Sequence, residues 1–285
     1  MTLNPRVDFA FKKLFGSEEN KSLLKAFVNA VLPAEDQVAS LELKNPYTLK
    51  RFQREKVSIF DIKAIDQRGR RFNIEMQITD QLDYEKRALH CWSNLYAEQI
   101  NQGAGYNRLE KTIGIHILNF NLLDEPDYHN VYKVLNMNSK KPAFEDLQLH
   151  TIELKKFNQD MDHLTTALDR WVVFLQRAGE FKKGKVPKQL KAEPEIGHAI
   201  QVLNTLYLSD EEREIYENRQ LWLLDEEEAL RTAEIRGIIK GRVEGRVEGR
   251  VEGEAIGIEK GKIEMAVKLK AKGFSKEVIM EITGL

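Results

Sequence analysis

The sequence KVSIFDIKAIDQRGRRFNIEMQI, residues 56–78, has the pattern of a β-hairpin. Its two halves, residues 57–65 and 71–78, are rich in β-branched and aromatic residues, which favour β-strands. Between them, the turn sequence DQRG at residues 66–69 places a glycine where a positive φ is expected. The sequence therefore predicts two antiparallel strands joined by a tight turn.

Two carboxylates interrupt these apolar strands, Asp61 in the first and Glu75 in the second. If Ile65 faces Arg71, then Asp61 faces Glu75 directly, with Cβ atoms about 5 Å apart. Two like charges this close are unfavourable, and a divalent cation between them removes the conflict, because cations such as Mg²⁺ (or Mn²⁺ or Ca²⁺) take carboxylate oxygens. Gln77 points to the same side as Glu75. The hypothesis is a metal site, and it depends on register, because a one-residue slip separates the two acids. The alternative is a surface hairpin whose polar face carries acids.

The same residues resemble the core of the PD-(D/E)XK nucleases. Asp61, followed after the hairpin by Glu75-Met76-Gln77, is similar to the motif of that superfamily, with Gln77 where a lysine usually stands. Within the superfamily, the chain resembles the Rpn-type recombination-promoting nucleases, a transposase-like family. The segments similar to theirs are residues 8–16, 73–77 and 87–106 and the glycine-repeat tail after residue 236.

The resemblance implies an α/β fold with a restriction-endonuclease-like core, in which helices flank a mixed sheet, and an α-helical C-terminal extension. It also implies a Mg²⁺-dependent DNA endonuclease linked to recombination, mobile elements or defence against foreign DNA. Asp61 and Glu75 are expected to hold the metal, and Gln77 to orient the attacking water. Because Gln77 lacks the charge of a lysine, the alternative is a catalytically weak or inactive nuclease-fold protein that binds DNA or a partner.

Two further residues are candidates for this site. In the family's fold a helix precedes the catalytic strands and can add an acid near the metal, which makes Asp8 a candidate. Arg87 lies on a predicted helix over residues 83–101 and would supply the positive charge that Gln77 lacks. An ordinary solvated arginine is the alternative for Arg87.

Composition narrows the class of protein. The 285 residues carry a formal net charge of −1, so overall charge gives no sign of nucleic-acid binding, and any basic patch must be local. The single cysteine, Cys91, excludes an intrachain disulfide and fits a reducing compartment. No apolar run reaches 18 residues, and the N-terminus lacks a secretory apolar region, so we expect a cytoplasmic protein.

The remaining chain is predicted to complete the sheet and add helices. The expected elements are helices over residues 17–31 and 166–178, strands over 112–120 and 147–154, and short C-terminal helices over 264–271 and 275–282. His116, inside one of these strands, is interpreted as a core histidine rather than a metal ligand. The expected domains are a nuclease-like core over 1–160, a helical region over 161–236, a glycine-repeat helix or linker over 237–262 and a short helical element over 263–285.

The tail has a four-residue repeat. Glycine recurs every fourth residue from Gly237 to Gly261, and Gly-Arg-Val-Glu occurs three times over residues 241–252. On a helix, identical residues four apart align, so arginines repel arginines, and each glycine costs about 1 kcal/mol relative to alanine. An isolated helix is therefore marginal, and the hypothesis is a self-association helix that makes the protein a homo-oligomer. The alternative is a flexible linker.

Overall fold

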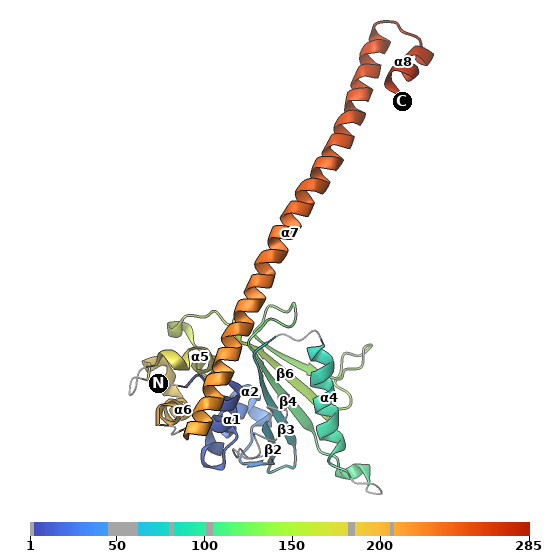
Figure 1. Ribbon diagram of the computed structural model, residues 1–285. Helices are drawn as coiled ribbons and strands as arrows, with labels where there is room; N and C mark the ends of the chain where they lie inside the picture. Colours follow the sequence, from blue (N-terminus) through green and yellow to red (C-terminus); the bar gives the residue numbers. More distant parts are fainter. Residues whose placement is uncertain (1–2, 45–61, 80–82, 101–104, 182–185, 206–207) are drawn as a thin grey trace. The chain divides into compact units, whose positions relative to one another are not determined.

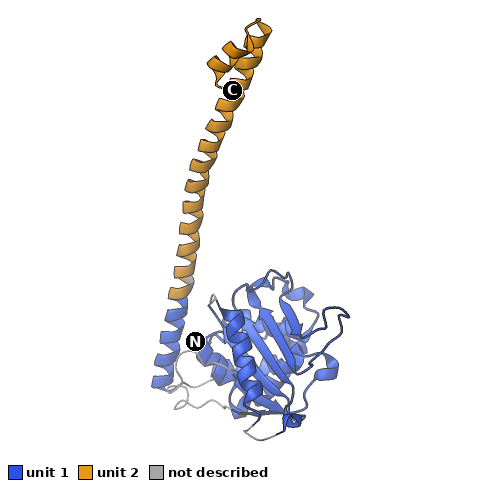
Figure 2. Cartoon of the chain, turned by 90° about the vertical axis from the view of Figure 1, so that its right-hand side faces the viewer, with its two compact units in different colours: residues 1–224 blue, residues 225–285 orange. Residues whose placement is uncertain are grey.

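The computed structural model describes residues 3–44, 62–79, 83–100, 105–181, 186–205 and 208–285. The chain forms two compact units, residues 1–224 and residues 225–285 (Figure 2). Within the described residues, no helix is both long enough and apolar enough to cross a membrane.

A mixed six-stranded sheet forms the centre of the first unit (Figure 1). Its strand order is β1-β2-β3-β4-β6-β5. The pairs β1–β2, β2–β3 and β5–β6 are antiparallel, whereas β3–β4 and β4–β6 are parallel. The strands are β1 (Leu41–Leu43), β2 (Ile62–Asp66), β3 (Arg71–Gln77), β4 (Thr112–Leu118), β5 (His129–Lys133) and β6 (Leu147–Glu153).

The predicted hairpin is present as β2 and β3. Gly69 in its turn has a φ of 84°, the left-handed conformation that favours glycine. The Asp66 carboxylate accepts hydrogen bonds from the backbone N–H groups of Arg68 and Arg70, which fixes the turn. Ile65 faces Arg71, so the predicted register is confirmed over the described pairs. Residues 57–61 of the predicted first strand, Asp61 among them, lie outside the described part of the chain.

Helices cover the two faces of the sheet unequally. One helix, α4 (Tyr84–Ala97), packs on one face, where the indole N–H of Trp92 donates to the carbonyl of Thr112 at 2.8 Å. In the described part of the chain, further helices lie on the other face (Figure 1). They are α1 (Asp8–Phe15), α2 (Lys21–Val31), α5 (Ala167–Arg177) and α6 (Pro194–Thr205). The main hydrophobic core includes their apolar residues together with Ile74 of β3 and Ile115 of β4.

Two helix predictions need correction. The helix expected from residue 17 begins at Lys21, after a short 3₁₀ turn over residues 18–20, because the Ser17 hydroxyl donates to the Lys13 carbonyl instead of capping a helix. The helix expected over 264–271 is not separate. It is the end of α7 (Asp210–Ala271), a continuous helix of 62 residues, followed by α8 (Lys276–Thr283).

Candidate active site

Glu75 lies on the central strand β3, facing α4. Side chains alternate along a strand, so Ile74 and Met76 enter the main core while Asn73, Glu75 and Gln77 face the opposite side. Glu75 is only 2% exposed. A carboxylate buried to this extent is costly unless charged or polar groups surround it, so its neighbours define the site.

Arg87 is the charged neighbour of Glu75. Its Nη2 donates to Glu75 Oε1 at 2.6 Å, a short, charge-assisted hydrogen bond. Arg87 reaches the carboxylate because it lies in the first turn of α4, which packs beside β3. The structure thus brings together two residues that the sequence predicts for the site, and a metal bound at Glu75 would have to share the carboxylate with Arg87 or displace it.

His116 and Tyr84 line the other side of the Glu75 carboxylate. The parallel register pairs Glu75 with His116, whose Nδ1 is 3.7 Å from Glu75 Oε2 and 2.8 Å from the Tyr84 hydroxyl. Burial, together with the smaller effect of the positive charge of Arg87, lowers the pKa of His116 to about 4. Burial also raises the pKa of Tyr84 well above its ordinary value. At neutral pH a neutral imidazole and a neutral phenol therefore share this hydrogen bond.

This lowered pKa predicts a loss of stability in acid. The ordinary pKa of histidine is 6.5, so between pH 6.5 and about 4 the unfolded chain binds a proton at His116 that the folded protein does not. The stabilising contribution is complete above pH 6.5 and is lost as the pH falls towards 4. His150, whose pKa burial lowers to about 3, acts in the same direction. Urea midpoints at pH 7.5 and pH 5 should differ less in His116→Gln than in the wild type, whereas exposed His163→Gln should match the wild type. Equal pH sensitivity of the two variants would contradict the assignment.

Gly114 makes room for the His116 ring. A Cβ atom at this position would lie 2.7 Å from Leu149 Cδ2 and 2.9 Å from His116 Nε2. Gly114→Ala is therefore expected to displace the imidazole and to lower the free energy of unfolding by about 1–3 kcal/mol. Gly197→Ala is the matched control, because nothing lies within 4 Å of its Cβ position and alanine favours the helix there. Urea unfolding measures both, and equal midpoints would refute the prediction.

Gln77 lies at the end of β3 among polar groups. Its side-chain Nε2 donates a long hydrogen bond of 3.5 Å to the Thr79 carbonyl. The backbone carbonyl of Gln77 accepts from the backbone N–H of Asn119 at 2.9 Å. Arg6 donates to the Asn119 side chain at 3.3 Å. Arg6 is thus a cation near this strand end that sequence reasoning missed, because only the fold brings the N-terminal segment to the end of β4.

The described contacts of Asp8 are with residues of α1 and α7 and not with Glu75. Its Oδ1 accepts from the backbone N–H of Phe9 at 2.6 Å, and its Oδ2 is 3.7 Å from Nε of Arg219, which belongs to α7. Burial raises the pKa of Asp8, an effect that Arg219 opposes. These contacts make Asp8 part of the packing between α1 and α7, and its role at a metal stays a prediction.

The described oxygen ligands near Glu75 suit a hard cation, but they are too few to form a complete metal site. Glu75 and Gln77 offer carboxylate and amide oxygens, which Mg²⁺ and similar cations take. Within the described residues there is no group of three His, Cys, Asp or Glu side chains that could hold a metal. Asp61, the second predicted ligand, lies outside those residues. The role of Asp61 as the second metal ligand stays a prediction.

The chain matches a known protein family over most of its length. A family described as PD-(D/E)XK nuclease family transposase matches residues 5–233. The match covers most of the chain, including the whole sheet, α4 and the first part of α7. The comparisons with curated proteins and with solved structures gave no significant match.

Proposed function

Because the chain belongs to the PD-(D/E)XK nuclease transposase family, we propose that it is a metal-dependent DNA endonuclease hydrolysing phosphodiester bonds. Family membership carries a restriction-endonuclease-like fold, and the mixed six-stranded sheet flanked by helices agrees with it. It also supports a nuclease-type function. The DNA substrate, the endonucleolytic cut, Mg²⁺ as the cation and a link to recombination, mobile elements or defence against foreign DNA are the proposed steps beyond it.

The buried Glu75 carboxylate is the observation that carries the proposal. It lies on the strand that holds the family motif, next to the Arg87 guanidinium. We assign Glu75 and Asp61 as metal ligands. The register of the described pairs between β2 and β3 supports this assignment, because it is the register on which the Asp61–Glu75 pair depends.

The other side chains have assigned roles around these ligands. When bound, a divalent cation lowers the pKa of a water and offsets the charge that builds on the phosphate. Gln77 would orient the attacking water through its amide. Arg87 would supply positive charge that Gln77 cannot, either to Glu75 or to the phosphate. Neutral His116, held by Tyr84, packs beside the carboxylate without competing with Arg87 for its charge.

Cleavage of supercoiled plasmid tests the proposal. The wild-type protein should nick plasmid with Mg²⁺ or Mn²⁺ and stop when EDTA is added. Asp61→Asn removes one ligand charge with little change in shape and should slow nicking by about 100-fold or more. Asp124→Asn, an exposed aspartate outside the site, is the control and should cut normally. Nicking that survives EDTA, or that Asp61→Asn leaves unchanged, would refute metal-dependent cleavage at this site.

A nuclease-fold protein that binds DNA or a partner without efficient cleavage is the second candidate. Two observations favour it: Gln77 occupies the usual position of the lysine, and Arg87 already binds Oε1 of Glu75. Fluorescence anisotropy with labelled duplex separates the candidates. Binding without nicking, together with nicking gained by Gln77→Lys, would establish the weak-nuclease alternative.

Self-association through the glycine-repeat helix is also proposed. The repeat lies inside α7, where its side chains are exposed. Homo-oligomerisation would cover them and offset the unfavourable glycines.

A further inference from the structure

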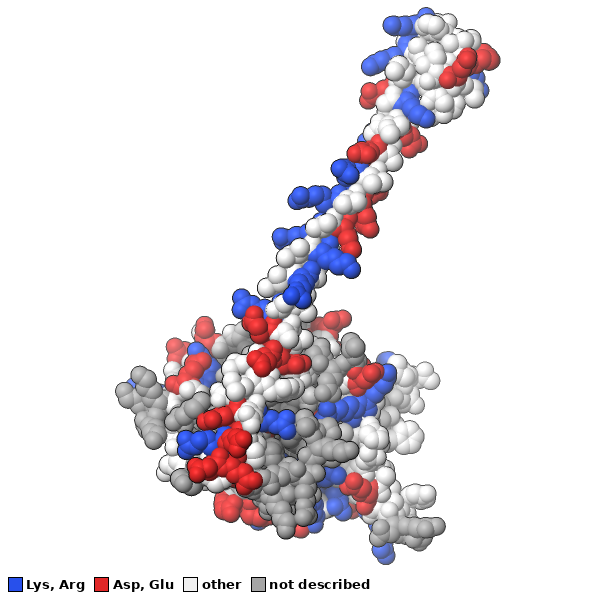
Figure 3. Space-filling model, in the orientation of Figure 1, with Lys and Arg blue, Asp and Glu red and all other residues white. Residues whose placement is uncertain are grey.

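The repeat divides the surface of α7 into four columns. At about 100° per residue, the valine column lies between an arginine column and a glutamate column, and the glycine column lies roughly opposite. Figure 3 shows basic side chains along one side of the middle of this helix and acidic side chains along the other, with an uncharged strip between them. The columns are Val243, Val247 and Val251; Arg242, Arg246 and Arg250; Glu244, Glu248 and Glu252; and Gly241, Gly245 and Gly249.

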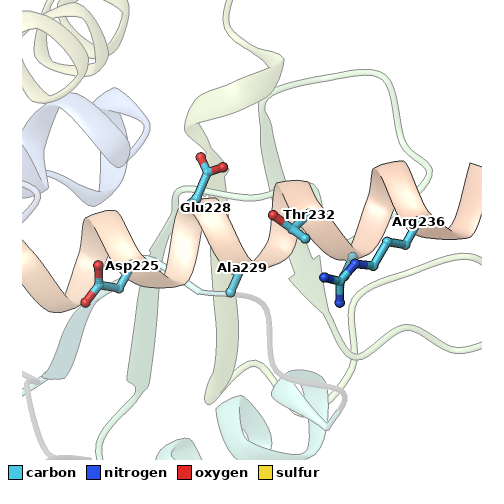
Figure 4. Close-up of a pocket in the computed structure, with 6 residues that line it drawn as sticks. Asp225, Glu228, Ala229, Thr232 and Arg236 are labelled. Carbon is cyan, nitrogen blue, oxygen red and sulfur yellow. The ribbon is translucent and has the colours of Figure 1, made fainter.

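The uncharged strip is open along the second unit. Val243, Val247 and Val251 are 59%, 51% and 59% exposed. Further towards the N-terminus of α7, a hollow of about 400 Å³ is lined by small residues between acids and an arginine, among them Ala229 and Thr232 (Figure 4). Eighteen residues make five turns, so Ala229 lies on the same side of the helix as Val247. Arg236 and Lys240 lie on this same side between the hollow and the repeat, so the uncharged strip is confined to the repeat itself.

The arginine and glutamate rows beside the strip do not pair with each other within the helix. The spacing gives no arginine of the repeat a glutamate of the repeat three or four positions away. At its edges, the ion pairs Lys240–Glu244 and Arg250–Glu254 are exposed and long, at 3.8 and 3.9 Å. Three arginines and three glutamates in separate rows form a surface that is complementary to itself. The fitting occupant is therefore a second copy of α7.

The order of the rows fixes the direction of that second copy. In a parallel two-fold pair, each helix places its left flank against the right flank of its partner, so arginines meet glutamates. In an antiparallel pair, like flanks meet, and arginines would face arginines. We infer that two copies of α7 pack in parallel, with their valine columns in contact and each arginine row against the partner's glutamate row. The glycine column also lies between the arginine row and the glutamate row. Contact between two copies through their glycine columns would therefore also require the two helices to be parallel.

The four-residue spacing also limits the extent of the contact. A column of residues four apart is inclined to the helix axis, and two such columns pack at a crossing angle of about −50°. The contact is therefore local and is centred on Val247. Because each core precedes its own α7 in the chain, a parallel pair attaches both cores to the same end of the pair. If the proposed function holds, such a pair offers two nuclease cores to the two strands of one duplex. The helix contact itself does not depend on nuclease activity.

Disulfide trapping in the full chain tests the direction. In a Cys91→Ser background, Val243→Cys and Val251→Cys are each expected to form a cross-linked dimer on mild oxidation. When a tagged Val243→Cys chain and an untagged Val251→Cys chain are co-expressed, the parallel pair gives the two matched dimers and little mixed dimer. A dominant mixed dimer would show an antiparallel pair and overturn the inference. A monomeric mass in sedimentation, or dimers without any cross-link at either valine, would overturn it as well.

Exchanging the charged residues of the repeat tests whether the arginine and glutamate rows hold the two helices together. A chain with all three arginines of the repeat changed to glutamate has acids on both flanks, and a chain with its three glutamates changed to arginine has bases on both. Each alone should associate at least about 10-fold more weakly than the wild type, and an equimolar mixture should recover a 1:1 dimer. Unchanged self-association of either variant would refute the role of the rows. The readout is mass, so a failure here is distinct from a failure of the nuclease proposal.

Discussion

Glu75→Gln is expected to reduce Mg²⁺-dependent plasmid nicking by about 100-fold or more while the protein stays folded. Glutamine has nearly the same shape as glutamate and keeps an oxygen that can accept from Arg87, so the buried hydrogen bond of 2.6 Å can be retained. What is lost is the negative charge, which a hard cation needs from its ligand. A loss of about 100-fold corresponds to about 2.7 kcal/mol of transition-state stabilisation.

The control for Glu75→Gln is Glu85→Gln. Glu85 lies on α4 near Arg87 in the sequence but is exposed, so the same chemical change there should leave nicking unchanged. Circular dichroism and the urea midpoint establish that both variants are folded. Binding of Mn²⁺, followed by its electron paramagnetic resonance signal, should weaken in Glu75→Gln alone. Wild-type nicking and wild-type Mn²⁺ binding by Glu75→Gln would remove Glu75 from the site.

The hairpin shows what a local pattern can predict. Strand-forming residues, a DQRG turn and a fixed side-chain alternation specify both the two strands and their register, because the buried face permits only one pairing. The edge strands β1 and β5 gave no such signal. β1 has three residues, and β5 is a partly exposed HNVYK segment, so neither carries the apolar alternation that marks an inner strand.

The surroundings of Glu75 show what the local pattern cannot predict. Arg87 is a candidate from the sequence because the family resemblance implies that the helix after the hairpin packs beside the sheet. The contact of His116 with Tyr84 depends on the parallel register of β3 and β4 and on the path of α4, which no short segment specifies. The tail shows the opposite error. The sequence predicts a short helix over 264–271 that is separate from the glycine repeat, whereas α7 continues through both segments to Ala271.

The second large effect is expected in the core, from Trp171→Ala. Trp171 lies on α5 and is fully buried, with its ring 5.7 Å from Phe15, 5.8 Å from Phe27 and 5.6 Å from Phe174 between centroids. These aromatic residues join α1, α2 and α5 beneath the sheet. Removing the indole leaves a cavity that rigid neighbours fill only in part, so the free energy of unfolding should fall by about 3–5 kcal/mol. Proteins of this kind have a total of about 5–15 kcal/mol, so the loss is a large share.

Trp222→Ala is the matched control for this prediction. Trp222 lies on α7 within the first unit and is 46% exposed, so the same substitution should cost less than about 1 kcal/mol. Trp171→Phe keeps an aromatic ring in the cluster, so its loss in the free energy of unfolding should lie between those of Trp171→Ala and Trp222→Ala. Urea unfolding followed by far-ultraviolet circular dichroism measures all three, because the helical signal does not require either tryptophan. If Trp171→Ala and Trp222→Ala shift the midpoint equally, the aromatic cluster does not hold α1, α2 and α5 together. The support of the sheet that carries Glu75 would then have to come from the aliphatic residues of the core.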